Sequence, residues 1–112
     1  MTVPILEEIK KSLGVEADNI GFDYELLVFI NSTAASLVQM GVSELDIDID
    51  ESTDWPTFGS IALGRLVKHH ITLRTKVSFD PTASETIAKS LADIAVQLEG
   101  RILYENEAIA NP

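Results

Sequence analysis

The last third of the chain predicts one unusually long helix, and this feature limits the possible folds most. Apolar residues recur there at spacings of four, three, four and four, which is typical of one helix face: Ile87, Leu91, Ile94, Leu98 and Ile102. About 26 residues at about 1.5 Å each span about 39 Å, whereas a compact domain of this size has a radius of gyration of about 13 Å. We therefore expect part of this helix to protrude or to pack against another molecule, as in an assembly subunit.

Composition fits one soluble domain that spans residues 1–112. Hydrophobic residues make up 46% of the chain, which is enough for a core, and there is no cysteine for disulfides, thiolate metal sites or nucleophiles. The N-terminus lacks the basic and apolar regions of a signal peptide. No segment reaches the run of about 18 apolar residues that a membrane span needs. We expect an intracellular-type protein with no membrane partner.

The formal net charge of −10 disfavours direct nucleic-acid binding, because an acidic surface repels the phosphate backbone. Six acids and no base fall within eleven residues: Glu44, Asp46, Asp48, Asp50, Glu51 and Asp54. Four of the eight bases follow in the next segment: Arg65, Lys68, Arg74 and Lys76. The acidic run is either solvated surface or a docking surface for a complementary patch on another subunit.

The pattern predicts an all-α fold, a small bundle of about four helices. We expect these helices at residues 4–13, 23–40, 60–78 and from 84 almost to the C-terminus, with the sharp stop Asp80-Pro81-Thr82 between the last two. Pro4 suits a first turn, Asp23 and Ser60 suit N-caps, and Gly14 and Gly41 end the first two helices. The second helix is apolar nearly all round, so we expect it to be buried on more than one side, either as the central helix of the domain or because a neighbour covers it.

An extended acidic loop is expected between the second and third helices. In it Leu45, Ile47 and Ile49 alternate with aspartates, a period of two that suits an edge-like segment or a loop in a helical protein. Like-charge repulsion predicts that the loop is mobile in the isolated chain and ordered only in an assembly. Trp55 either fixes the loop to the bundle or anchors a contact with another subunit.

No motif predicts catalysis, a metal or a cofactor. Asp46, Asp48 and Asp50 have the opening spacing of a calcium loop, but Glu51 stands where that loop needs glycine and Thr57 where it needs a bidentate glutamate. His69 and His70 are adjacent on a helix, so their side chains point about 100° apart and cannot chelate one metal.

Basic residues on the third helix are the better candidate site. Arg65, Lys68 and His69 share one helix face, which continues less regularly towards Lys76. This face is either solvated or pairs with the acidic loop of a neighbouring copy. The end of the last helix, with Tyr104 between Leu103 and Ile109, is the next candidate for self-assembly.

The whole chain resembles the small head–tail connector proteins of long-tailed phages, also called head-completion or adaptor proteins. The matching parts are ILEEIKKSLGV, FDYELLVFINSTAASLVQMGV, STDWPTF, LGRLVKHHITLRTKVSFDPTAS and the long helix with its Leu-Glu-Gly-Arg-Ile. These are patterns of polar and apolar residues rather than catalytic signatures. The acidic loop at residues 43–54 departs from a simple compact member.

The resemblance implies a structural subunit of the virion that is made in the host cytoplasm. Family members form a ring, usually of twelve copies, beneath the portal after DNA packaging. The ring extends the channel through which DNA passes as cargo, and it offers a surface to further connector or tail proteins. The alternative function is an acidic helical adaptor or inhibitor that binds a basic protein one-to-one.

Overall fold

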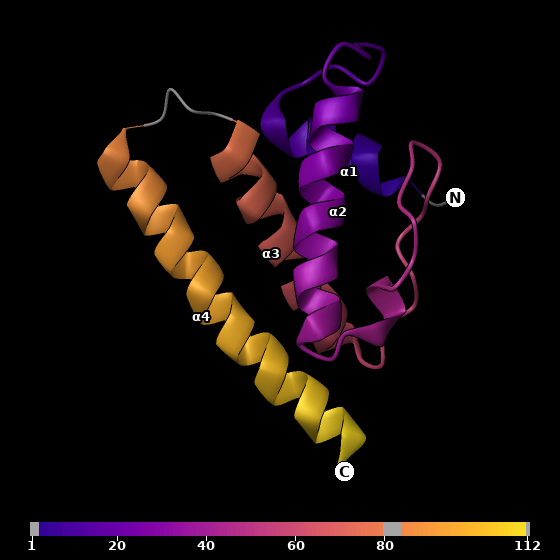
Figure 1. Cartoon of the computed structure of the whole chain (residues 1–112), viewed down its shortest axis with the longest axis vertical. Coiled ribbons are helices and arrows are strands. Elements are labelled where there is room, and N and C mark those ends of the chain that lie inside the picture. The colour runs from indigo at the N-terminus through magenta and orange to yellow at the C-terminus, as the bar shows by residue number, and fades with distance from the viewer. Residues whose placement is uncertain (1–2, 80–83, 112) are drawn as a thin grey trace.

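The computed structural model describes residues 3–79 and 84–111, and it is all-α (Figure 1). The four helices are α1 (Ile5–Leu13), α2 (Asp23–Gln39), α3 (Ile61–Phe79) and α4 (Glu85–Ala110), with a short 3₁₀ turn, η1 (Ser43–Leu45), after α2. This arrangement confirms the predicted small bundle with a long C-terminal helix. Within the described residues no helix has the length and apolar character needed to cross a membrane.

Most helix ends follow local capping rules. The hydroxyl oxygens of Ser60 and Ser84 accept hydrogen bonds from backbone N–H groups three residues on, at 3.0 and 3.2 Å. Gly14 has a φ of 76°, the left-handed conformation that favours glycine after a helix. Asp23 is the exception, because it makes no side-chain cap and its carboxylate binds Lys10 instead. The predicted stop at residues 80–82 lies outside the described residues.

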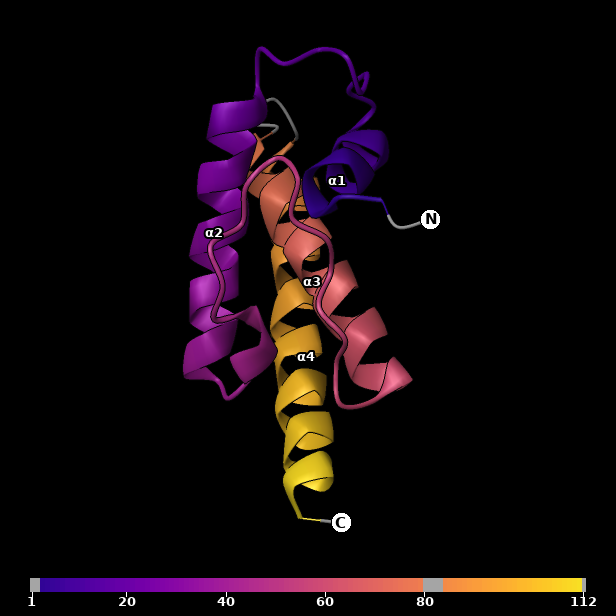
Figure 2. The same ribbon diagram turned by 90° about the vertical axis from the view of Figure 1, so that its right-hand side faces the viewer.

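Helix α3 is the centre of the bundle. It packs against α1, α2 and α4, whereas α4 packs against α3 alone among the described helices. The main core is buried between α1, α2, α3 and the segment after α2, and Ile102 joins it from α4: Ile5, Leu6, Ile9, Leu26, Ile30, Ala34, Leu37, Val42, Leu45, Ile49, Leu63, Val67, Ile71 and Ile102. Figures 1 and 2 show α1 and the 46–58 segment on the side of the molecule opposite α4.

The buried face of α4 differs from the predicted stripe. Its buried residues are Ala95, Leu98 and Ile102, whereas Ile87 and Ile94 are exposed and Leu91 is half-buried. The stripe predicts that Leu91 and Ile94 are buried against the second and third helices, and this prediction is wrong for Ile94 and only partly met by Leu91. Ala95 takes that position because its small side chain lets the α4 backbone approach α3, and Ile94 is turned about 100° away from it. The first ten residues of α4, up to Ile94, contribute no buried residue to the core.

Helix α2 is buried on one side only. Tyr24 and Val28 are exposed on its outer face, and Ala35 is exposed one to two turns further on. The alternative that α2 is the central helix is thus wrong, since α3 has that place, and cover of α2 by a neighbour stays a prediction. Val28 and Ala35, two of the apolar residues off the main stripe, face solvent here.

The segment between α2 and α3 is a loop rather than a strand. The burial of its apolar residues does vary along the segment, since Leu45 and Ile49 are buried and Ile47 is exposed. The only ladder-type contact in the described residues is an isolated bridge between Pro4 and Asp54. This segment therefore covers the bundle as an extended strap that closes on the start of α1.

Candidate functional site

The outer side of α3 carries a concentration of positive charge in this acidic chain. No acid occurs from Ile61 to Phe79, while four of the eight bases do. Arg65, His69 and Lys76 are exposed and Lys68 is half-buried. We call these four residues the basic face. Within the described residues Arg65, Lys68 and Lys76 make no ion pair.

Arg74 does not belong to the basic face, although the sequence grouped it there. Its guanidinium donates a hydrogen bond to the carboxylate of Glu99 on α4. Arg74 therefore fastens α4 to α3, and its role in a contact with another subunit stays a prediction. Sequence reasoning missed this pairing because the two residues are 25 positions apart.

The acidic segment, residues 44–54, is anchored at both ends of its extended part. The amide of Asn31 donates to the Ile49 carbonyl at 2.9 Å, and its oxygen accepts from the Ile49 N–H at 3.1 Å. The backbone N–H of Ile5 donates to the Thr53 carbonyl at 2.9 Å. These anchors offset the charge repulsion on which the expectation of mobility was based. That expectation stays a prediction, to be checked by amide exchange with and without a partner.

The six acids of the segment have different surroundings. Asp50 accepts hydrogen bonds from the backbone and hydroxyl of Ser52 and from the Thr53 hydroxyl, and these bonds lower the pKa of the Asp50 carboxyl. Glu44 accepts from the Gly59 N–H at 3.2 Å. Asp54 is exposed at the bridge to Pro4. The carboxylates without a contact in the described structure are three: Asp46, Asp48 and Glu51.

Trp55 joins the loop to the bundle. Its indole N–H donates to Glu8 on α1 at 2.7 Å, and the ammonium of Lys68 lies 5.6 Å from the centre of its ring. The half-buried side chain packs against the core. These contacts support the loop-fixing role. The role as an anchor between subunits stays a prediction.

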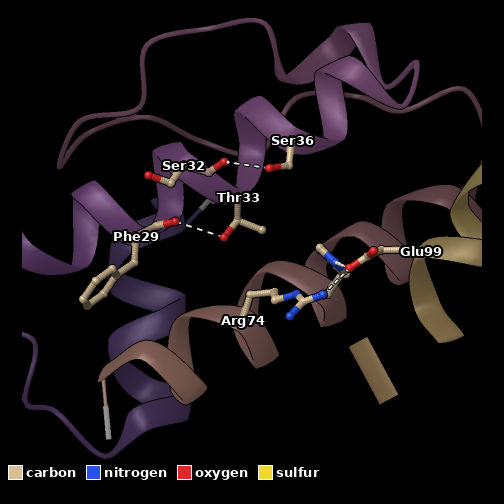
Figure 3. A network of polar contacts seen from close by, with 7 residues as sticks. Phe29, Ser32, Thr33, Ser36, Arg74 and Glu99 are labelled. Atoms are coloured by element: carbon tan, nitrogen blue, oxygen red, sulfur yellow. Dashed lines mark hydrogen bonds and ion pairs between the residues drawn. The ribbon is translucent and has the colours of Figure 1, made fainter. Parts of the chain in front are cut away.

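A polar cluster lies between α2, α3 and α4 (Figure 3). His70 is buried and its Nε2 lies 2.9 Å from the Glu99 carboxylate that also binds Arg74. A cavity of about 280 Å³ borders the cluster on the α2 side, where Ser32, Thr33 and Ser36 line it. The hydroxyls of Thr33 and Ser36 bond to carbonyls one turn back on α2, so they do not reach across. No group of three or more His, Asp or Glu in the described chain could hold a metal ion.

Helix α4 presents its own outer face. Tyr104 is 75% exposed and lies beside Arg101, which makes no ion pair in the described residues. The tip of α4 is held rather than free, because Glu105 accepts from the Ser60 hydroxyl and Asn106 donates to the Gly41 carbonyl. Ile109 packs near Gly59. The expected protruding end is therefore fixed to the loops at both ends of the 41–60 segment.

Comparison with known proteins decides the identity. A family model described as "Phage connector protein" matches residues 5–108, almost the whole chain. The chain belongs to the phage connector protein family. No curated protein and no solved structure gives a significant match.

Membership confirms the family predicted from the sequence and sets the general role of this connector. The connector has a structural role in the phage, and membership suggests that it is not an enzyme. Membership also implies a location at the head–tail junction of the virion and assembly with the portal and other virion proteins. The charged faces are thus candidate contact surfaces.

The His70 cluster makes the stability of the connector sensitive to acid. Burial lowers the pKa of His70, although the Glu99 carboxylate opposes this effect. For Glu99, burial raises the pKa, but the hydrogen bonds from Arg74 and His70 outweigh it and the net shift is downward. Both groups are therefore protonated more readily in the unfolded chain. Their contributions are complete above the unfolded pKa values, 6.5 and 4.5, and are lost as the pH falls through the folded ones.

We expect the free energy of unfolding to fall between about pH 7 and pH 5, where His70 titrates in the unfolded chain. His70→Gln should flatten this part of the profile, because it removes the titrating group and keeps a polar side chain. Urea melts at several pH values measure the effect. His69→Gln is the matched control, since His69 is adjacent and exposed. Equal profiles for both variants would show that the buried cluster does not control acid sensitivity.

Proposed function

We propose that the chain is a ring subunit, one of twelve identical copies, that docks beneath the portal after DNA packaging. The ring extends the DNA channel and offers a surface to further connector and tail proteins. The chain is made in the host cytoplasm and DNA passes it only as cargo. The observation that carries the proposal is the separation of charge between the basic face of α3 and the acidic segment.

A closed ring of identical copies needs two different, complementary faces on each copy. The basic face has three cationic side chains without an ion pair, and the acidic segment has Asp46, Asp48 and Glu51 without a contact, within the described structure. Opposite charges on separate faces favour pairing between copies and disfavour the wrong register. The remaining acidic surface suits a channel wall, because it gives DNA no phosphate-binding cations.

Charge reversal tests the contact between copies. Arg65→Glu with Lys76→Glu should reduce ring formation about tenfold or more, because like charges then face each other across the interface. Asp46→Lys with Asp48→Lys in the same chain should restore part of the assembly. Sedimentation or mass measurement at low and high salt gives the oligomer size, and high salt should weaken the wild-type contact.

The substituted positions are chosen from their surroundings. Lys68 is avoided because it contacts Trp55, and Asp50 because its carboxylate holds the turn at Ser52 and Thr53. Loss of the ring without rescue would reject direct pairing of these two faces. A stable one-to-one complex with a basic protein, and no ring with or without portal, would instead support the acidic adaptor or inhibitor.

A further inference from the structure

A hollow of the connector lies on the side opposite α4 (Figure 1). It is an open groove of about 940 Å³ between α1, the turn that follows it and Trp55. Its apolar lining comes from Val3, Val15, Ala17, Trp55 and Pro56. Three carboxylates line it with only two ammonium groups: Glu7, Glu8 and Glu16 against Lys11 and Lys68. The groove therefore suits an apolar side chain accompanied by a cation.

The walls of the groove are fixed by contacts within the chain. Lys10, only 2% exposed, donates to the Ala17 carbonyl at 3.1 Å and holds the turn after α1 in place. The bond from Trp55 to Glu8 fixes the opposite wall against α1. A preformed groove loses little conformational entropy when it is filled, so even a small contact can contribute to affinity.

The opposite side of the molecule presents side chains that match this groove. Tyr104 is 75% exposed on α4, and Arg101 lies one turn before it. Both border a shallow hollow with Leu66 and Gln97. Arg101 also borders a second hollow with Arg65 and His69 of the basic face, so the two surfaces are continuous. Tyrosine and arginine are the residue types that most often dominate binding energy at interfaces.

We propose that Tyr104 of one copy inserts into the α1–Trp55 groove of the next copy, with Arg101 paired to the carboxylates of Glu7 and Glu16. This inference rests on the proposed ring and names the contact that closes it. In this contact the Tyr104 side chain packs against the apolar lining of the groove. The Arg101 guanidinium lies against its rim, which has a net negative charge. A copy cannot fill its own groove, because α4 lies on the far side of the bundle (Figures 1 and 2). The contact therefore propagates from head to tail.

The absence of cysteine in the chain allows a direct test. The variant Ala17→Cys with Ala108→Cys keeps Tyr104 and places the second cysteine one turn further along α4, at an exposed position. It is treated with a short bis-maleimide and separated on a denaturing gel. We expect a ladder that extends beyond two copies, because each copy carries both ends of the contact. Ala17→Cys with Tyr24→Cys is the matched control, since Tyr24 is 83% exposed but lies on α2. A control ladder as strong as the first would overturn the proposal.

A second variant measures the energetic weight of the contact with the groove intact. Tyr104→Ala should weaken association about 30-fold, the effect of losing a dominant interface side chain. Tyr24→Ala should leave association unchanged. If Tyr104→Ala forms the ring as well as the wild type does, and the cysteine pair gives no ladder, this contact is rejected. The ring function then still stands. If the wild type stays monomeric with and without portal, and the cysteine pair gives no ladder, both this contact and the ring function are rejected.

Discussion

Ile102→Ala is expected to destabilise the isolated connector by about 2–5 kcal/mol, the usual range for truncation of a fully buried isoleucine. Ile102 is 0% exposed and is the residue through which α4 reaches the main core. Its loss leaves a cavity between α4 and α3, and α4 has no other helix among the described ones on which to repack. Urea melts of dilute, monomeric protein give the free energy of unfolding.

Ile94→Ala is the matched control on the same helix. Ile94 is 40% exposed, so its truncation removes little buried surface and should cost less than about 1 kcal/mol. Equal losses for the two variants would show that the N-terminal half of α4 is packed as tightly as the C-terminal half. In an assembled ring the Ile94 variant can lose more, and comparison of the two states separates folding from contacts between copies.

The contrast between Ile94 and Ala95 shows what periodicity can and cannot predict. The length of α4 and its start near Ser84 follow from signals within a few residues, and both were predicted correctly. The stripe from Ile87 to Ile102 also has the right general direction. It cannot decide between neighbouring positions on the helix surface, because that choice depends on how closely α3 approaches, which is a tertiary property.

Long-range polar pairs account for the other differences. Asp23 was predicted as a cap but binds Lys10, 13 residues away, and Arg74 was assigned to the basic face but binds Glu99. Each residue has the expected charge and position on its helix, yet its partner comes from another element. The remaining basic face needed only local information, since the absence of acids from α3 is visible in the sequence.

The acidic segment is a third feature that the sequence predicted only in part. Its composition predicted repulsion, and the six carboxylates are indeed crowded. Composition gave no sign that Asn31 on α2 would hold both backbone groups of Ile49, 18 residues away. The buried side chain of Ile49 and its two backbone bonds to Asn31 hold the charged run against the bundle in the described structure.

Asp23→Ala is expected to cost about 3 kcal/mol, because it leaves a buried ammonium group without its counter-ion. The Lys10 side chain is 3% exposed and its Nζ lies 2.8 Å from the Asp23 carboxylate, which is 23% exposed. After the substitution the one remaining bond of Nζ in the described structure is to the Ala17 carbonyl. The same change should loosen the turn that forms one wall of the α1–Trp55 groove.

Lys10→Met should be much less harmful, since methionine fills the same apolar path without a charge and the exposed part of Asp23 can be hydrated. The double variant should therefore be more stable than Asp23→Ala alone, although it carries one more substitution. Asp18→Ala controls for the loss of an exposed acid in the same loop and should lie within about 0.5 kcal/mol of wild type. Urea melts of the four variants form the test. If Asp23→Ala and Lys10→Met cost the same, the pair acts through its hydrogen bond and not through the buried charge.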